Sequence, residues 1–278
     1  MSARSKRRSI AFCLVGVVCC LIMFFPVYWM FITSIKPMGE IYHKPPLLIP
    51  KNPTLKAYVD NFIKSRDVYN YFRNSCIVAL GSMAFVVILA APTSYALSRL
   101  KIRGKTLIML TLLMVQMFPS IVLVTPLYIT FGRLGLNNNY FGLILANATI
   151  SLPFVILVLR PYFLGLPKGL EDAAAIDGCS KWGTFWRVML PLTKPGLVTV
   201  AAFSFLFAWG ELLFATTLTS KESMRPITAG IYRFIGQFQV EWNSLMAVSF
   251  AASLPIIIVF IALQNQIVSG ITAGAVKQ

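Results

Sequence analysis

Long apolar stretches alternate along the chain with short segments rich in charged and polar residues. Six of these stretches are long enough to cross the hydrocarbon core of a bilayer as helices, which takes about 20 residues. They comprise residues 10–33, 75–98, 106–131, 140–162, 196–218 and 246–270. The pattern predicts an all-α membrane protein with six transmembrane helices.

The composition agrees with this prediction and argues against a soluble protein. Hydrophobic residues make up 57% of the 278 positions and charged residues only 12%, whereas soluble domains carry about 25% charged residues. The formal net charge of +16 would suggest a nucleic-acid partner in a soluble protein. Here the Lys and Arg residues lie in short segments between apolar runs, where they set membrane topology, so we expect no nucleic-acid binding.

The basic residues also predict the orientation. If the helices alternate in direction, three basic segments fall on one side of the membrane, which is then cytoplasmic. They are the N-terminal cluster (Arg4, Lys6, Arg7 and Arg8), the link 99–105 and the region 168–194. Both termini are therefore expected in the cytoplasm. The first run is long enough to span the bilayer and lacks a clear cleavage site, so we expect an uncleaved helix rather than a signal peptide.

These boundaries divide the chain into four parts. They are a cytoplasmic N-terminus with the first helix (1–33), an extracytoplasmic segment (34–73), a membrane core (74–270) with a cytoplasmic loop (163–195), and a cytoplasmic C-terminal tail (271–278). The extracytoplasmic segment is rich in proline, which predicts extended structure followed by a short helix near residues 55–65. It is either a connector on the membrane surface or a docking surface for an external partner.

Neither cysteine nor histidine indicates a metal site. The five cysteines fall in apolar runs or in the cytoplasmic loop, with no CxxC pair, so no disulfide framework is predicted. The single histidine, His43, has no neighbouring ligand residues. We expect no metal and no catalytic residues, because no cluster of acids, histidines or other reactive groups is apparent.

Few polar or helix-breaking residues interrupt the apolar runs. Prolines lie inside five of them, at positions 26, 92, 119, 126, 153 and 255, either as passive bends or as kinks that let a bundle rearrange. Glu211 either lines a solute path or pins one helix to another, since an ionised group inside a span needs a polar partner. Gln116 and Asn147 either bond between helices or line the same path.

The segment Leu170–Pro191 is a compact, charged interruption between two apolar runs. Glu171 and Asp172 fall in the predicted first turn of a helix, where free N–H groups and the helix dipole favour negative charge. Ala173 and its two alanine neighbours leave that helix without bulk, and Gly178 supplies a turn. The sequence predicts a folded cytoplasmic knob with a second helix ending at Pro191.

The second helix carries an apolar stripe. Trp182, Phe185, Trp186 and Met189 recur at i, i+3, i+4 and i+7. The stripe could pack under the bundle, lie on lipid or fill a cleft of a partner protein.

The spacing within this segment resembles the EAA loop of ABC-importer permeases. That family's pattern is Glu-Ala-Ala, three residues, Gly, nine residues, Ile, any residue, Leu-Pro. Here Asp172-Ala173-Ala174, Gly178 and Val188-Met-Leu190-Pro191 keep the spacing throughout. Asp172 replaces Glu and Val188 replaces Ile, and the shorter reach of Asp bears on its pairing with a basic residue of an ATPase.

Motifs elsewhere resemble the carbohydrate branch of this family, of the maltose-permease G-subunit kind. They are Asn74-Ser75, Tyr95-Ala-Leu-Ser-Arg99, Pro126-Leu-Tyr128, Leu134-Gly-Leu136, Tyr140 to Leu145, and Trp209-Gly-Glu211. The last is commonly Trp-Asn-Glu in that branch, and Gly210 stands for the Asn here.

The resemblance implies the type I ABC-importer permease fold, with residues 163–195 as the coupling loop. It implies a second permease subunit, two cytoplasmic ATPases, an extracytoplasmic solute-binding protein and the bilayer of a bacterial or archaeal inner membrane as partners. The ATPase-coupling residues would be Glu171, Asp172, Ala173, Ala174, Gly178, Trp182, Leu190 and Pro191. The chain has no GxxxxGK[ST] loop, so ATP would be used by the partners and no cofactor bound here. An ion-coupled secondary transporter is the alternative.

Overall fold

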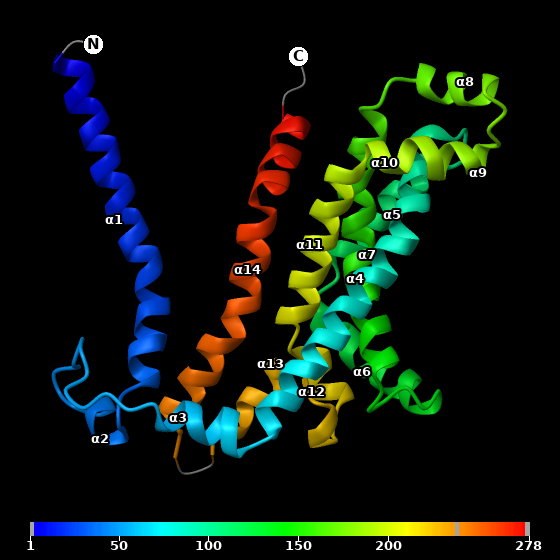
Figure 1. Ribbon diagram of the computed structural model, residues 1–278. Coiled ribbons are helices and arrows are strands. Elements are labelled where there is room, and N and C mark those ends of the chain that lie inside the picture. The colour runs from blue at the N-terminus through cyan, green and yellow to red at the C-terminus, as the bar shows by residue number, and fades with distance from the viewer. Residues whose placement is uncertain (1–2, 237–238, 276–278) are drawn as a thin grey trace. The chain divides into compact units, whose positions relative to one another are not determined.

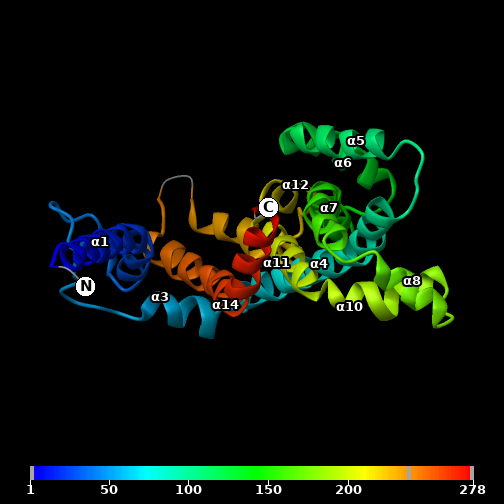
Figure 2. The ribbon, with the colours of Figure 1, turned by 90° about the horizontal axis from the view of Figure 1, so that it is seen from above.

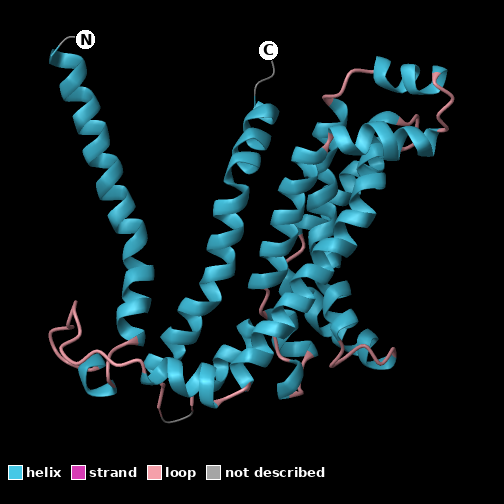
Figure 3. Ribbon diagram, viewed as in Figure 1, coloured by secondary structure: helices cyan, strands magenta, loops and turns pink. Residues whose placement is uncertain are grey.

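The computed structural model describes residues 3–236 and 239–275 (Figure 1). Within these ranges the secondary structure is helical, and only one isolated bridge, between Ile235 and Val240, has β geometry (Figure 3). The last three residues of the expected C-terminal tail lie outside the described residues. The all-α prediction is confirmed.

The long helices follow the apolar runs. They are α1 (Ala3–Ser34), α4 (Asp67–Arg99), α5 (Lys105–Met117), α6 (Ser120–Arg133), α7 (Tyr140–Leu164), α11 (Lys194–Gly210) and α14 (Trp242–Ala275). In the described part of the chain, four helices are each long and apolar enough to cross a membrane, and two further spans arise if bent helix pairs are counted. Four predicted spans therefore match single helices, and the other two, 106–131 and 196–218, overlap helices that belong to bent pairs.

The predicted span 106–131 is wrong as one continuous helix. It is broken into α5 and α6, which meet at 95°. Phe118 and Pro119 at the break have extended ψ values of 126° and 129°. Proline lacks an N–H and disfavours helical geometry in the residue before it, which accounts for the break. Five other prolines of the apolar runs lie inside continuous helices: Pro26, Pro92, Pro126, Pro153 and Pro255.

The predicted span 196–218 is also two helices. α11 ends at Gly210, and α12 (Leu213–Leu218) begins after Glu211 and Leu212. Glu211 is extended, with φ −69° and ψ 129°. At its other end α11 follows the helical turns Lys181–Leu192 at an angle of 78°.

The chain divides into two compact units. One comprises Met1–Val68 with Ile231–Leu254, and the other comprises Tyr69–Gly230 with Pro255–Gln278. In the first unit, α2 (Met38–Ile41), α3 (Lys56–Tyr58) and the π-helical turn η1 (Val59–Lys64) follow α1. The short helix expected near residues 55–65 is confirmed, and the proline-rich stretch before it is irregular. Short turns η3 (Glu222–Met224), α13 (Ile227–Gly230) and η4 (Ile231–Phe234) precede α14.

In the second unit α7 lies between α5 on one side and α4 with α11 on the other (Figure 2). Small residues allow close approach, as expected for packing within a membrane. A Cβ at Gly81 of α4 would meet Ile144 Cδ1 of α7 at 2.5 Å, and a Cβ at Gly196 of α11 would meet Tyr162 Cγ of α7 at 2.5 Å. The hydroxyl of Ser94 donates to the Ile156 carbonyl at 3.2 Å.

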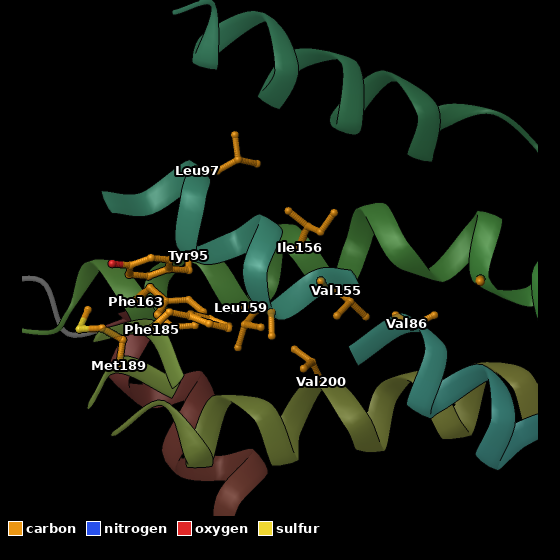
Figure 4. Close-up of a cluster of buried hydrophobic side chains, with 13 residues drawn as sticks. Val86, Tyr95, Leu97, Val155, Ile156, Leu159, Phe163, Phe185, Met189 and Val200 are labelled. Carbon is orange, nitrogen blue, oxygen red and sulfur yellow. The ribbon is translucent and has the colours of Figure 1, made fainter. Parts of the chain in front are cut away.

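A buried apolar cluster joins these helices to the loop of residues 163–195 (Figure 4). α4 contributes Tyr95, α7 contributes Leu159 and Phe163, and the loop itself contributes Phe185 and Met189. The Tyr95 ring lies 5.7 Å from that of Phe163 and 5.2 Å from that of Phe185. The second helix of the loop is therefore part of the packed core.

Candidate functional site

The loop of residues 163–195, expected in the cytoplasm, folds as a knob of two helical arms. The first arm is α8 (Gly169–Ile176), and the second is α9 (Lys181–Thr184), the π-helical turn η2 (Phe185–Met189) and α10 (Leu190–Leu192). Glu171 and Asp172 lie in the first turn of α8, as the sequence predicts. The N-terminal end of a helix favours these carboxylates because its N–H groups lack partners.

The turn between the arms has the geometry expected of glycine. Gly178 has φ +81°, and its amide donates to the Ala175 carbonyl at 3.1 Å. The amide of Cys179 then bonds to the Ala174 carbonyl at 2.9 Å. A Cβ at Gly178 would meet nothing within 4 Å, so the requirement for glycine there is conformational rather than steric.

The second arm does not end at Pro191. Pro191 lies in the first turn of α10, where its missing N–H is no loss, and the arm runs on to Leu192. The hydroxyl of Thr193 then donates to the carbonyls of Met189 and Leu190, at 3.1 and 2.9 Å. Leu190 is half-buried and Pro191 exposed.

The expected apolar stripe is divided between two environments. Phe185 and Met189 are 1% and 0% exposed, whereas Trp182 and Trp186 are 60% and 53% exposed. Both indoles contact the Phe185 ring, Trp182 stacked at 5.3 Å and Trp186 edge-on at 5.3 Å. A π-helical turn begins at Phe185, so the 3.6-residue periodicity that predicted a single face does not hold there.

Glu171 faces α4, and its side chain is only partly exposed. Tyr95 Oη of α4 donates to Glu171 Oε1 at 3.0 Å, and Arg99 Nε lies 3.8 Å from Glu171 Oε2. The Arg99 side chain is only 5% exposed, and its Nη2 also donates to the carbonyls of Leu166 and Pro167. This Tyr95–Arg99–Glu171 cluster fixes α8 to the C-terminal end of α4.

The opposite face of α8 is exposed. Asp172, Ala173 and Ala175 are exposed, and Ala174 is buried. Ile176 is 87% exposed and was missed by the sequence analysis, although it lies in the three-residue gap of the motif. Tyr95 and Arg99 were noted only as part of a motif, and no local signal pairs them with Glu171.

An open cavity of about 160 Å³ lies where α5 and α6 break, against α7 and α11. Its lining comprises Val115, Gln116, Phe118, Ser120, Leu123, Thr149, Ile150, Ser151, Phe154 and Phe207. The rings of Phe154 and Phe207 meet edge-on at 5.5 Å. The cavity thus combines an exposed amide and hydroxyl groups with an aromatic wall, a combination suited to a small polar solute with apolar faces.

The three polar residues expected along a solute path do not form one site. Only Gln116 lines the cavity. Asn147 is buried, and its Nδ2 donates to the Leu143 carbonyl of its own helix at 2.8 Å. The Glu211 carboxylate accepts from the amides of Phe214 and Ala215, at 2.8 and 3.0 Å, and so caps the start of α12.

Metal-ligand geometry is not found among the residues that the structure describes, where no three His, Cys, Asp or Glu side chains come together. His43 Nδ1 lies 2.8 Å from the Pro45 carbonyl within its own loop.

Comparison with known proteins gives one consistent family. Residues 87–273 match the family described as binding-protein-dependent transport system inner membrane component. The chain is 34% identical over 253 residues to the sulfoquinovosyl glycerol transport system permease protein SmoH of Agrobacterium fabrum, covering 91% of this chain and 88% of the relative. It is 38% identical over 255 residues to the trehalose transport system permease protein SugB of Mycobacterium tuberculosis, covering 91% and 92%.

An archaeal relative and a solved structure extend the match over nearly the whole chain. Identity is 33% over 265 residues to the trehalose/maltose transport system permease protein MalG of Thermococcus litoralis, covering 94% of both chains. A bacterial ABC transporter involved in the import of the acidic polysaccharide alginate has a chain of the same fold, with a TM-score of 0.81 and 22% identity, covering 95% of this chain and 98% of that one.

Proposed function

The chain belongs to the family of binding-protein-dependent transport system inner membrane components, and from this premise we propose that it is a permease subunit that imports a sugar or related solute at the expense of ATP hydrolysed by partner subunits. Relatives named for sulfoquinovosyl glycerol, trehalose and trehalose/maltose transport support a sugar-type solute. The proposed assembly adds a second permease subunit, two cytoplasmic ATPases and an extracytoplasmic solute-binding protein. In this assembly the chain forms half of the translocation path and binds no nucleotide.

The proposed orientation follows from charge. Both termini and the 163–195 loop lie in the cytoplasm of a bacterial or archaeal cell, because the basic segments of the chain fall on that side of the inner membrane.

The two-sided geometry of α8 is the observation that carries the proposal. Its outer face, with Asp172, Ala173 and Ile176, is exposed and lacks bulk apart from the Ile176 side chain. Its inner face is fixed to α4 through Glu171. A helix held on one side and open on the other can transmit the displacement of a docked ATPase.

Two routes carry this displacement into the membrane. The Tyr95–Arg99–Glu171 cluster joins α8 to α4, and Phe185 packs in the cluster shared by α4, α7 and α11. Because packed cores resist continuous deformation, the cytoplasmic ends of these helices would move together. The break at Pro119 then separates α6 from α5, and the break at Glu211 separates α12 from α11, so that α6 and α12 can move differently.

The solute path is proposed to pass the cavity at the α5 and α6 break. Gln116 offers an amide, Ser120 a hydroxyl, and Phe154 and Phe207 an apolar wall. Glu211 is proposed to shape this region indirectly, by holding the start of α12.

The experiment is reconstitution of the complete transporter with an Ala173→Trp variant. Added bulk on the exposed face of α8 should abolish solute-stimulated ATP hydrolysis and uptake, while the variant still inserts in the membrane. Thr130→Trp, at an exposed position at the other end of the same unit, is the matched control and should remain active. Normal stimulation in the Ala173 variant contradicts the coupling role, and uptake without the ATPases contradicts ATP-driven import.

A further inference from the structure

The proline-rich stretch after α1 folds back along that helix. This proline loop (residues 42–53) is closed at its base by the Thr54 amide, which donates to the Ile35 carbonyl at 2.8 Å. The Glu40 carboxylate accepts from the amides of Lys51 and Asn52, both at 2.9 Å. Figure 1 shows the loop rising beside the last turns of α1.

The tip of the loop reaches back to the level of the membrane span. Tyr28 Oη of α1 donates to the Leu48 carbonyl at 2.8 Å. Tyr28 belongs to the apolar span Phe12–Ser34, and it precedes the last residue of that span by six positions, or about 9 Å of helix. The loop tip is therefore beside the last turns of the span and not beyond it.

The side chains at the tip are apolar and uncovered. Leu48 is 60% exposed and Ile49 is 73% exposed. On α1, Tyr28 contacts the tip, and Phe25 lies beside Tyr28 and Trp29, with the Phe25 and Trp29 rings stacked at 6.0 Å. Aromatic residues of this kind gather where a span meets the headgroup region.

The backbone of the tip has few N–H groups, and two of its carbonyls are paired. Three of the six residues Pro45-Pro-Leu-Leu-Ile-Pro50 are prolines, which have no N–H to satisfy. The carbonyl of Leu47 accepts from Lys36 Nζ, and that of Leu48 accepts from Tyr28. Backbone groups near hydrocarbon must be paired within the protein, and the three prolines and these two bonds lower the number of tip groups that need water at the bilayer edge.

Two basic side chains flank the apolar tip. Lys44 and Lys51 are exposed on either side of the apolar tip. Lysines that flank buried apolar side chains at an interface reach lipid phosphates with their ammonium groups.

We propose that the proline loop is a membrane anchor, in which Leu48 and Ile49 insert among the acyl chains at the edge of the bilayer while Lys44 and Lys51 contact lipid phosphates. Which side of the membrane the loop enters depends on the orientation given under the proposed function. Whether the loop inserts does not depend on that orientation, because insertion follows from the contacts between the loop and α1. The anchor fixes the end of α1 at a set depth.

The test places an environment-sensitive probe at the loop tip. In a variant with the five native cysteines replaced, Ile49→Cys is labelled with a nitrobenzoxadiazole dye, and the full chain is reconstituted in vesicles of phosphatidylcholine and phosphatidylglycerol. The expected result is blue-shifted emission, quenching by lipid-borne nitroxides and protection from aqueous iodide. Gly39→Cys is the matched control, since its side chain would meet nothing within 4 Å, and it should be quenched by iodide.

Two results overturn the anchor. One is iodide quenching at position 49 equal to that at position 39, which means that the tip lies in water. The other is protection that develops only when the solute-binding protein is added, which means that the loop is a protein-docking surface. Neither readout needs ATP or transport, so the outcome is independent of whether the chain imports a sugar.

Discussion

The phenol of Tyr95 donates a hydrogen bond to Glu171 Oε1 at 3.0 Å, across 76 residues of sequence. Arg99, one helical turn after Tyr95, brings its guanidinium to the other oxygen of the same carboxylate. The first helix of the knob, α8, is thereby tied to α4 by a charge-assisted contact. Glu171 and Asp172 are neighbours in sequence, yet Glu171 turns toward the bundle and Asp172 toward solvent.

Tyr95→Phe should uncouple the ATPases from solute without releasing them. The substitution removes the hydrogen bond to Glu171 and should cost about 1 kcal/mol of stability, while the outer face of α8 is unchanged. Solute-stimulated ATP hydrolysis should fall, and co-purification of the ATPases should persist. Tyr128→Phe, at an exposed position, is the control. Loss of ATPase binding in the Tyr95 variant would show instead that the cluster shapes the docking face.

Gly196→Ala should destabilise the packing of α11 on α7. The added Cβ would lie 2.5 Å from Tyr162 Cγ, so the ring or the helix must shift, at a cost of about 1–3 kcal/mol. Thermal unfolding in detergent measures the loss. Gly210→Ala in the same helix, where a Cβ meets nothing within 4 Å, should be nearly neutral. Equal effects at the two positions contradict the close approach.

Glu211→Ala should loosen the start of α12. The carboxylate caps two free amides there, and loss of a helix cap costs about 0.5–2 kcal/mol. Glu211→Gln retains one acceptor oxygen and should lose less stability. Hydrogen exchange of the peptide 211–219 in detergent reports the change. If Glu211→Gln abolishes uptake with unchanged exchange, Glu211 acts on the solute path and not as a cap.

Gln116→Leu should lower uptake while basal ATP hydrolysis is retained. The substitution keeps side-chain volume and removes the amide from the cavity. Asn147→Leu is the comparison, because its amide bonds within α7 and does not line the cavity, so its effect should be on stability. Two measurements separate the variants. The apparent affinity for solute should change in the Gln116 variant, and the thermal stability should change in the Asn147 variant. An unchanged uptake in the Gln116 variant would exclude this cavity from the path.

The hydrogen bonds that Glu40 makes at the base of the proline loop should persist in mild acid. Partial desolvation raises the pKa of Glu40, but hydrogen bonds from the Lys51 and Asn52 amides and from the Asn52 side chain outweigh it and lower the pKa below its ordinary value. A lowered folded-state pKa means that the carboxylate stabilises the loop at neutral pH and loses this effect only as pH falls through that lowered pKa.

Amide exchange at Lys51 and Asn52, corrected for intrinsic rates, should therefore stay slow until the pH falls below the ordinary range of a glutamate. In Glu40→Gln the same amides should exchange faster at neutral pH and show no such transition. A transition at the ordinary glutamate pKa in the unmodified chain would contradict the network.

The sequence alone determined the helical class, the number of apolar runs and the place of the knob. These follow from composition, from the length of each apolar run and from the spacing of Asp172, Gly178 and Pro191, all of which are local properties of the chain. The turn at Gly178 was also predictable, because a positive φ favours glycine whatever lies around it.

Only the tertiary structure decided which prolines break a helix and which partner each polar group takes. Pro119 separates two helices while Pro126, seven residues later, lies inside one, although both residues lack the same N–H. Glu171 pairs with Tyr95 and Arg99, and the Leu48 carbonyl accepts a hydrogen bond from Tyr28. Both contacts join segments that are far apart in sequence. Such pairs do not appear as a repeating pattern in the sequence, because they depend on how the helices pack and not on the neighbouring residues in the chain.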